Sequence, residues 1–176
     1  PDGQKILFTS YEHNNPDLFM IDVKTLKKVK VSGYKGINSG GVFSFNKQFI
    51  AFSGSIRGNT EIFLTHAKDF SKRVPLLKGH GIDVDPNFSP DGTQLAFVSG
   101  RYGNPHIFVA SLKWEDSGNR VSIRKTPPLK RLTYAGWYNA NPAWSPNSQK
   151  IAFAGYDKDI NRFDLFLMNA DGTNLE

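Results

Sequence analysis

The sequence predicts an all-β fold, a segment of a β-propeller made of four blades with four strands each. One short apolar segment occurs four times, and the phenylalanine that closes it falls at Phe8, Phe52, Phe97 and Phe153. These positions are 44, 45 and 56 residues apart, which is the spacing of propeller blades. No stretch of the chain shows the sustained 3.6-residue apolar pattern of an amphipathic helix.

The four copies also agree outside the apolar segment. They read PDGQKILFTS from Pro1, SFNKQFIAFSG from Ser44, SPDGTQLAFVSG from Ser89 and SPNSQKIAFAG from Ser145. A second phenylalanine follows eleven residues later in three copies and thirteen later in the last, at Phe19, Phe63, Phe108 and Phe166. We therefore expect blades at approximately residues 1–35, 36–80, 81–135 and 136–176.

The third copy shows how the strands of one blade follow one another. We expect strands at Asn87–Ser89, Gln94–Ser99, Ile107–Leu112 and Lys130–Thr133. Pro90, Asp91 and Gly92 form a turn between the first two strands, because proline presets φ, aspartate caps the turn locally and glycine accepts a positive φ. The second strand is apolar on successive residues, which is typical of burial on both faces between stacked blades.

Two connections are longer than their counterparts. The chain between Leu112 and Leu129 has about ten extra residues, and it is expected to form either an extended outer loop or an extra hairpin. The connection Tyr156–Arg162 carries a smaller insertion of two residues.

The strand count suggests an incomplete set of blades. The first copy begins at its turn and lacks an innermost strand, and the last copy lacks an outermost strand. Because open sheet edges promote association, we interpret the chain as an interior piece of a larger propeller, with self-association through its edges as a possible consequence.

Composition narrows the functional classes. The chain of 176 residues has no cysteine, which excludes disulfides and thiolate metal sites, and a formal net charge of +6. The basic segments Lys24–Lys30 and Arg120–Arg131 fall on loops or outer strands, and we favour a solvated edge over a nucleic-acid site. No apolar run approaches the roughly 20 residues of a membrane span, so membrane insertion is not expected.

The residues do not predict catalysis. The histidines His13, His66, His80 and His106 show no zinc-ligand spacing, so no metal site is predicted from them. Neither a Gly-x-Ser-x-Gly elbow nor a Gly-x-x-x-x-Gly-Lys loop is present. We therefore expect a binding protein rather than an enzyme.

The unusual exposed side chains are expected at one end of the propeller, which we call the connector mouth. It comprises the connectors Lys35–Ser39, His80–Asp85 and Trp137–Asn141 and the hairpin loops Glu12–Asn15, Arg57–Thr60, Arg101–Asn104 and Tyr156–Arg162. Aromatic and arginine side chains are typical interface anchors. The predicted partner-binding residues are Arg57, His80, Asp83, Asp85, Arg101, Tyr102, Trp137, Tyr138 and Asn139. Packing of Trp137 and Tyr102 between blades is the open alternative.

Asp83 and Asp85 alternate on one inner strand, so both side chains could point into a central channel. Asn38, Asn139 and Asn141 sit at comparable places in other copies, and oxygen ligands of this kind suit calcium. No compact calcium loop is present, so ordinary turn and strand-end hydrogen bonds are favoured and no cofactor is predicted.

Two segments carry a family resemblance, SPDGTQLAFVSGRYGNPHIFVASL and AFAGYDKDINRFDLFLMNADGTNLE. The connectors GINSGGVFSF, GIDVDPNFSP and GWYNANPAWSP share it. Together they resemble the PD40 class of WD40-like repeats, and more particularly the propeller of the TolB family of the bacterial Tol–Pal system. The second copy departs from the turn motif at Phe45–Lys47, and the fourth at Pro146–Ser148.

The resemblance implies a six-bladed ring preceded by a smaller α/β domain, in a non-catalytic protein of the periplasm. It implies the peptidoglycan-associated lipoprotein Pal as a partner, together with other Tol proteins, and roles in the cell envelope, protein transport and cell division. The alternative is the gating propeller of a prolyl-oligopeptidase-like peptidase or of a carbohydrate-active enzyme, in which PD40-type repeats also occur.

Overall fold

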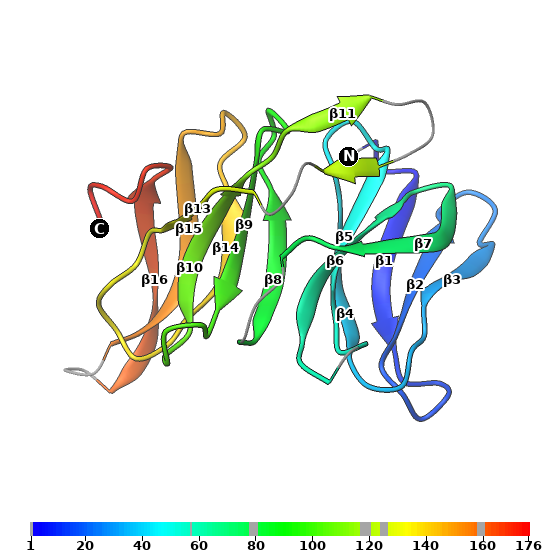
Figure 1. Ribbon diagram of the computed structural model, residues 1–176, viewed down its shortest axis with the longest axis horizontal. Coiled ribbons are helices and arrows are strands. Elements are labelled where there is room, and N and C mark those ends of the chain that lie inside the picture. The colour runs from blue at the N-terminus through cyan, green and yellow to red at the C-terminus, as the bar shows by residue number, and fades with distance from the viewer. Residues whose placement is uncertain (1, 57, 78–80, 117–120, 124–126, 158–160) are drawn as a thin grey trace.

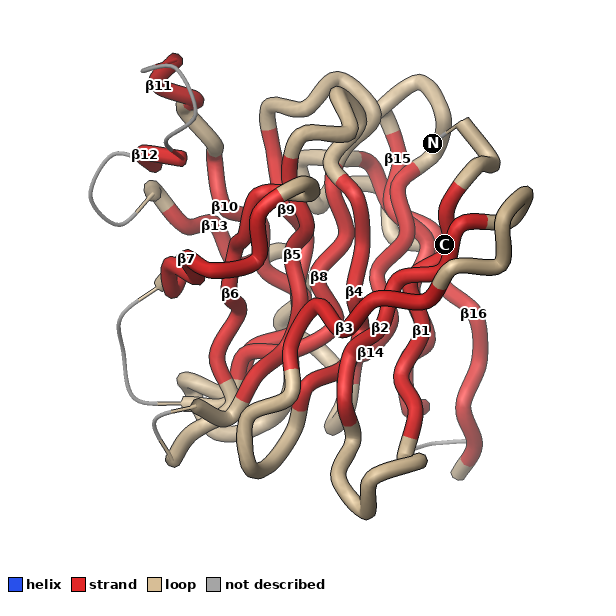
Figure 2. The backbone as a smooth tube through the Cα atoms, turned by 90° about the vertical axis from the view of Figure 1, so that its right-hand side faces the viewer, coloured by secondary structure: helices blue, strands red, loops and turns tan. Residues whose placement is uncertain are grey.

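The computed structural model describes residues 2–56, 58–77, 81–116, 121–123, 127–157 and 161–176. Their regular structure consists of strands joined by turns and loops, and the described ranges contain no helix (Figure 2). No helix long and apolar enough to cross a membrane is therefore found among these residues.

Four antiparallel sheets follow one another along the chain and stand side by side, from the blue end to the red end of Figure 1. The first contains β1 (Lys5–Ser10), β2 (Asp17–Asp22) and β3 (Lys28–Ser32). The second contains β4 (Asn38–Phe43), β5 (Phe49–Gly54), β6 (Glu61–His66) and β7 (Asp69–Pro75). The third contains β8 (Asp83–Phe88), β9 (Gln94–Ser99), β10 (His106–Ser111) and β13 (Leu129–Arg131), and the fourth contains β14 (Asn139–Trp144), β15 (Lys150–Asp157) and β16 (Arg162–Asn169). The predicted all-β fold of four propeller blades is confirmed.

The long insertion forms an extra hairpin, one of the two structures expected for it. β11 (Trp114–Asp116) pairs with β12 (Val121–Ile123) in an antiparallel sheet of its own. This hairpin branches off between β10 and β13, so it leaves the order of strands in the third sheet unchanged.

The inner strand of the third sheet begins earlier than expected, at Asp83 rather than Asn87. The register with β9 is interrupted by a bulge between Val84 and Asn87, and Asp85 has a φ of 53°. β4 and β14 have the same bulge, with Gly40 and Asn141 in the left-handed region. A residue with positive φ inserts one extra position and turns the strand, so the residues before the bulge belong to the same strand as Asn87.

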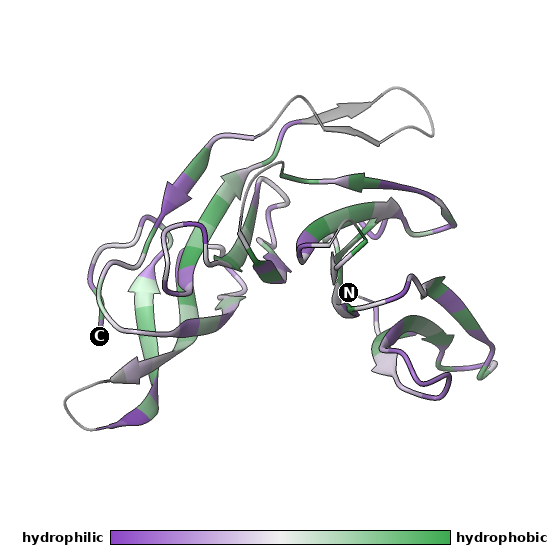
Figure 3. Cartoon of the chain, turned by 60° about the horizontal axis from the view of Figure 1, so that its bottom comes forward, coloured by the Kyte–Doolittle hydropathy of each residue, from purple (hydrophilic) through white to green (hydrophobic). Residues whose placement is uncertain are grey.

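The core lies between the sheets rather than within any one of them. Three clusters of buried apolar side chains join the first sheet to the second, the second to the third and the third to the fourth. Figure 3 shows the central parts of the strands as mainly hydrophobic and the loops as mainly hydrophilic.

Each sheet carries two phenylalanines directly opposite each other on neighbouring strands, which we call the aromatic pair of the blade. The pairs are Phe8–Phe19, Phe52–Phe63, Phe97–Phe108 and Phe153–Phe166, with ring centroids 5.8, 5.8, 5.9 and 5.5 Å apart. All four are cross-strand neighbours in the registers of their sheets. The predicted repeat is thus visible as one recurring contact.

The turns that depart from the Pro-Asp-Gly motif keep its geometry. In the third sheet Ser89 Oγ lies 2.6 Å from Asp91 Oδ1, and Gly92 has a φ of 73°. In the second sheet Ser44 Oγ lies 2.7 Å from Asn46 Oδ1, and Lys47 takes the glycine's place with a φ of 62°. The serine and Asx side chains therefore fix the turn, and Lys47 adopts a backbone conformation that a glycine adopts without strain.

We predict that Lys47→Gly raises the free energy of unfolding by about 0.5–1 kcal/mol, because it removes the steric cost of a left-handed residue with a Cβ. The loss of the exposed Lys47–Asp2 ion pair offsets little of this gain. Urea denaturation measures the change. Gly92→Ala is the matched control: nothing lies within 4 Å of the added Cβ, so its cost comes from the backbone alone. An unchanged midpoint for both variants would contradict the prediction.

Candidate functional site

The connector mouth is assembled by hydrogen bonds between each connector and the hairpin loop of the preceding sheet. The backbone N–H groups of Asp83 and Asn139, at the starts of β8 and β14, donate to the carbonyls of Thr60 and Pro105 over 2.9 and 3.0 Å. The N–H of Gly36 donates to Asn15 Oδ1 over 2.9 Å. These bonds place the loops and connectors at one end of the sheets, the lower end in Figure 1.

Three of the predicted partner-binding residues are exposed aromatic side chains of this mouth. Tyr102 is 70% exposed, Trp137 61% and Tyr138 44%. Tyr102 rests on the Phe108 ring at 6.0 Å, and Tyr138 meets Phe163 edge to face at 5.8 Å. Their exposure favours the surface interpretation over packing between blades.

Asp83 and Arg101 form a buried pair rather than an exposed anchor. The Arg101 Nη2 atom donates to both carboxylate oxygens of Asp83, over 3.0 and 3.2 Å, and Nε donates to Ser99 Oγ over 2.8 Å. Asp83 is 5% exposed. The guanidinium also lies 5.9 Å from the Phe97 ring centroid and 5.4 Å from that of Phe108. This ion pair therefore covers the aromatic pair of the third blade.

Asp85 is oriented by the bulge, not by the expected alternation with Asp83. Its N–H donates to Ser53 Oγ over 3.2 Å. Burial raises the pKa of its carboxyl, while the backbone N–H of Asn141 opposes the shift by donating to it. Within the described part of the chain no three His, Asp or Glu side chains are grouped as metal ligands are. The prediction that no cofactor is bound, and the calcium alternative that it was weighed against, both stay untested.

Asn139 is a buried amide that joins the connector to the third sheet. Its Nδ2 donates to the Ala135 carbonyl over 3.1 Å and lies 3.2 Å from His106 Nδ1, which is also 3.2 Å from Thr133 Oγ1. Burial, and secondarily the charge of Arg131, lowers the pKa of His106. The sequence predicted no metal role for His106 and named no contacts for it. Its contacts depend on the fold of the connector, so spacing alone could not reveal them.

The two remaining predicted residues, Arg57 and His80, lie outside the described residues.

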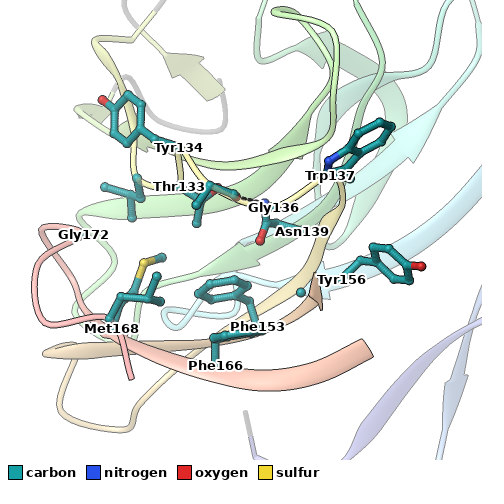
Figure 4. A pocket seen from close by; sticks show the side chains of 14 residues that line it. Thr133, Tyr134, Gly136, Trp137, Asn139, Phe153, Tyr156, Phe166, Met168 and Gly172 are labelled. Atoms are coloured by element: carbon teal, nitrogen blue, oxygen red, sulfur yellow. Dashed lines mark hydrogen bonds between the residues drawn. The ribbon is translucent and has the colours of Figure 1, made fainter. Parts of the chain in front are cut away.

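Sequence reasoning missed Tyr134 and Tyr156, which join Trp137 around a cavity of about 540 Å³. The cavity is lined by connector residues 132–137 and Asn139, and by Phe153, Gly155, Tyr156, Phe166 and Met168 of β15 and β16 (Figure 4). Aligning the four copies would have shown one signal, that glycine stands at positions 54 and 155 where the first and third copies have Ser10 and Ser99.

We predict that Arg101→Ile lowers the free energy of unfolding by about 2–3 kcal/mol, because it leaves the buried Asp83 carboxylate without its cation and uncovers the aromatic pair. Adding Asp83→Asn should recover most of the loss. The double variant reproduces the second blade, where Asn38 and Ile56 occupy the corresponding places. Thermal or urea unfolding compares the three proteins, and a double variant no more stable than Arg101→Ile would rule out the proposed cause.

We predict that acid destabilises the fold partly through His106. Its folded-state pKa is lowered, so the unfolded chain binds the extra proton first, and stability is lost as pH falls from the ordinary value of 6.5 toward the folded-state pKa. His106→Gln keeps a hydrogen-bond acceptor without titrating, and it should lose less stability over this window. The raised pKa of Asp85 makes its protonation favour the folded state as pH falls, which is the opposite sense. Asp85 is present in both the original protein and His106→Gln, so the difference between their urea unfolding curves isolates His106. Parallel pH profiles would refute the prediction.

The sequence of this chain is similar to those of known β-propeller proteins, in agreement with the fold described above. The family model described as the TolB β-propeller domain matches residues 1–176. The chain is 32% identical over 112 residues to the TolB homolog of Chlorobium luteolum, covering 64% of the chain and 25% of that protein. It is 29% identical over 117 residues to the Tol-Pal system protein TolB of Bordetella pertussis, covering 66% and 27%. The chain thus spans about a quarter of these relatives.

The crystal structure of TolB from Acinetobacter baumannii superimposes on the whole chain and on 41% of its own length, with a TM-score of 0.82 and 26% identity. An oligogalacturonate lyase in complex with manganese covers 99% of the chain and 49% of its own, with a TM-score of 0.70 but 16% identity, which shows a shared fold alone. Because the family model covers the full sequence, the chain belongs to the family of TolB β-propeller domains.

Proposed function

We propose that this chain is a non-catalytic binding scaffold of the Tol–Pal system that acts in the periplasm and binds the lipoprotein Pal at its connector mouth. Membership of the TolB propeller family supports the system, since a relative at 29% identity is named a Tol-Pal system protein. The observation that carries the binding role is the placement of three exposed aromatics at one mouth, Tyr102 on a hairpin loop and Trp137 and Tyr138 on one connector. Exposed aromatics in such clusters are typical interface anchors.

The buried ionisable side chains support a scaffold rather than a catalyst. Asp17 is held by Lys30 Nζ over 2.6 Å, and that contact is the main reason why its pKa is lowered. Asp83 is held by Arg101, and His106 lies in hydrogen-bond contact with Thr133 and Asn139. Each of these groups is engaged in joining strands or connectors. Six blades, an additional α/β domain, contacts with other Tol proteins and self-association stay predictions of the same proposal.

The test is direct binding of a Pal domain from the same organism to the intact protein that contains this chain, measured by calorimetry. Trp137→Ala and Tyr138→Ala should each weaken binding about tenfold or more, because central aromatic anchors dominate interface energies. Phe45→Ala is the matched control, since Phe45 is 61% exposed in the β4–β5 turn at the opposite end of the sheets. Absence of binding by the intact protein, or equal losses in all three variants, would disprove the proposal.

A further inference from the structure

The cavity of the fourth sheet occupies the place that corresponds to the position of the Arg101 guanidinium in the third sheet. Four side chains surround that guanidinium, namely Phe97, Phe108, Ser99 and Asp83. Their counterparts in the fourth sheet are Phe153, Phe166, Gly155 and Asn139, and all four line the cavity. The same framework therefore encloses a cation in one blade and an open space of about 540 Å³ in the next.

Glycine takes the place of Ser99 in the fourth blade, as it does in the second, where Gly54 holds the same position. A Cβ on Gly155 would lie 2.8 Å from the Phe166 ring and 3.2 Å from Asn139 Oδ1, so a serine like Ser99 could not be accommodated without a shift. Figure 4 shows the amide oxygen of Asn139 directed toward the Phe153 ring. The position of Arg101 is taken by Asp157, an acidic residue whose side chain lies outside those described.

The other blades cover their aromatic pairs with side chains of this chain. In the first blade the Nζ atoms of Lys28 and Lys30 lie 4.8 and 5.5 Å from the Phe19 ring centroid. In the second blade Ile56 packs against the cluster that contains Phe52 and Phe63. Two of the three covers are therefore cations, which aromatic faces attract through their quadrupole.

We propose that the cavity over Phe153 and Phe166 binds an arginine side chain of a protein partner. The guanidinium would lie on the two rings and donate to the Asn139 amide oxygen, as Arg101 lies on Phe97 and Phe108 and donates to Asp83. Arginine is favoured over lysine because its planar cation stacks on rings while donating in its own plane. This inference rests on the proposed function only in taking the partner to be a protein bound at the connector mouth, beside Trp137.

The two methionines of the chain provide a built-in test. Met168 lines the cavity, whereas Met20 is buried in the cluster between the first and second sheets. In a protein labelled at its methionine methyl groups, N-acetyl-arginine amide should shift the Met168 resonance saturably at concentrations of roughly 10 mM and leave Met20 in place. N-acetyl-citrulline amide has the same shape without the charge, and it should leave both resonances in place.

Two variants on the same strand sharpen the result. Phe166→Leu removes one ring of the pair, and the arginine-dependent shift should fall at least about fivefold. Phe163→Leu is the matched control, because Phe163 is exposed and lies outside the cavity lining, so the shift should persist. The Met20 resonance reports whether each variant remains folded.

The inference is overturned if arginine amide leaves Met168 unshifted, if citrulline amide acts equally, or if Phe166→Leu responds like Phe163→Leu. These outcomes are independent of Pal. Binding of Pal without a response to arginine amide would leave the proposed function standing and remove this inference. A response to arginine amide without binding of Pal would leave this inference standing and remove the proposed function.

Discussion

Contact between two phenylalanine rings on neighbouring strands recurs in every blade, and the blade interfaces are built around it. The rings lie in the same cross-strand register in all four sheets, so each pair presents a flat apolar surface to the neighbouring blade or loop. Burying such rings favours folding, but their faces also attract cations. Lysines meet that preference in the first blade and Arg101 meets it in the third, whereas in the second blade the apolar Ile56 packs against the cluster that contains the rings.

The inner strands add a second recurring constraint, the bulge at Gly40, Asp85 and Asn141. Both sides of the bulge pair with the strand's own sheet, and the starts of β8 and β14 also bond to the hairpin loop of the preceding sheet. The connectors that lead into β8 and β14 are thereby held in place by backbone bonds. This arrangement explains how Asn139 can be buried while Trp137 and Tyr138, one and two residues before it, are exposed.

The repeat made much of this fold predictable. Apolar triplets and Asx turns located the strands, because burial on both faces and turn chemistry are local properties of the sequence. The pairing of Asp83 with Arg101 was not predictable in the same way, since the residues are eighteen positions apart and meet only through the register Asp83↔Ser99. Both had been expected as surface anchors. The bulge is recognisable in the sequence of two strands, because glycine and asparagine, the residues at positions 40 and 141, readily adopt positive φ. In the third strand Asp85 is followed by Pro86, and this pair resembles an ordinary extended strand.

The faces of the sheets show how far each blade depends on its neighbours. Leu18, Ile62 and Ile107 immediately precede the second phenylalanine of the first three aromatic pairs, and each is completely buried. Leu165 holds the same position in the fourth blade and is 86% exposed. Burying such a side chain contributes about 1.5–3 kcal/mol, a contribution that the first three sheets receive from the sheet that follows each of them. Within these residues the second and third blades are packed on both faces, and the fourth on one. The cavity lies on the packed face of the fourth blade, against the third, so its walls belong to an interface that is already formed and do not depend on what covers Leu165.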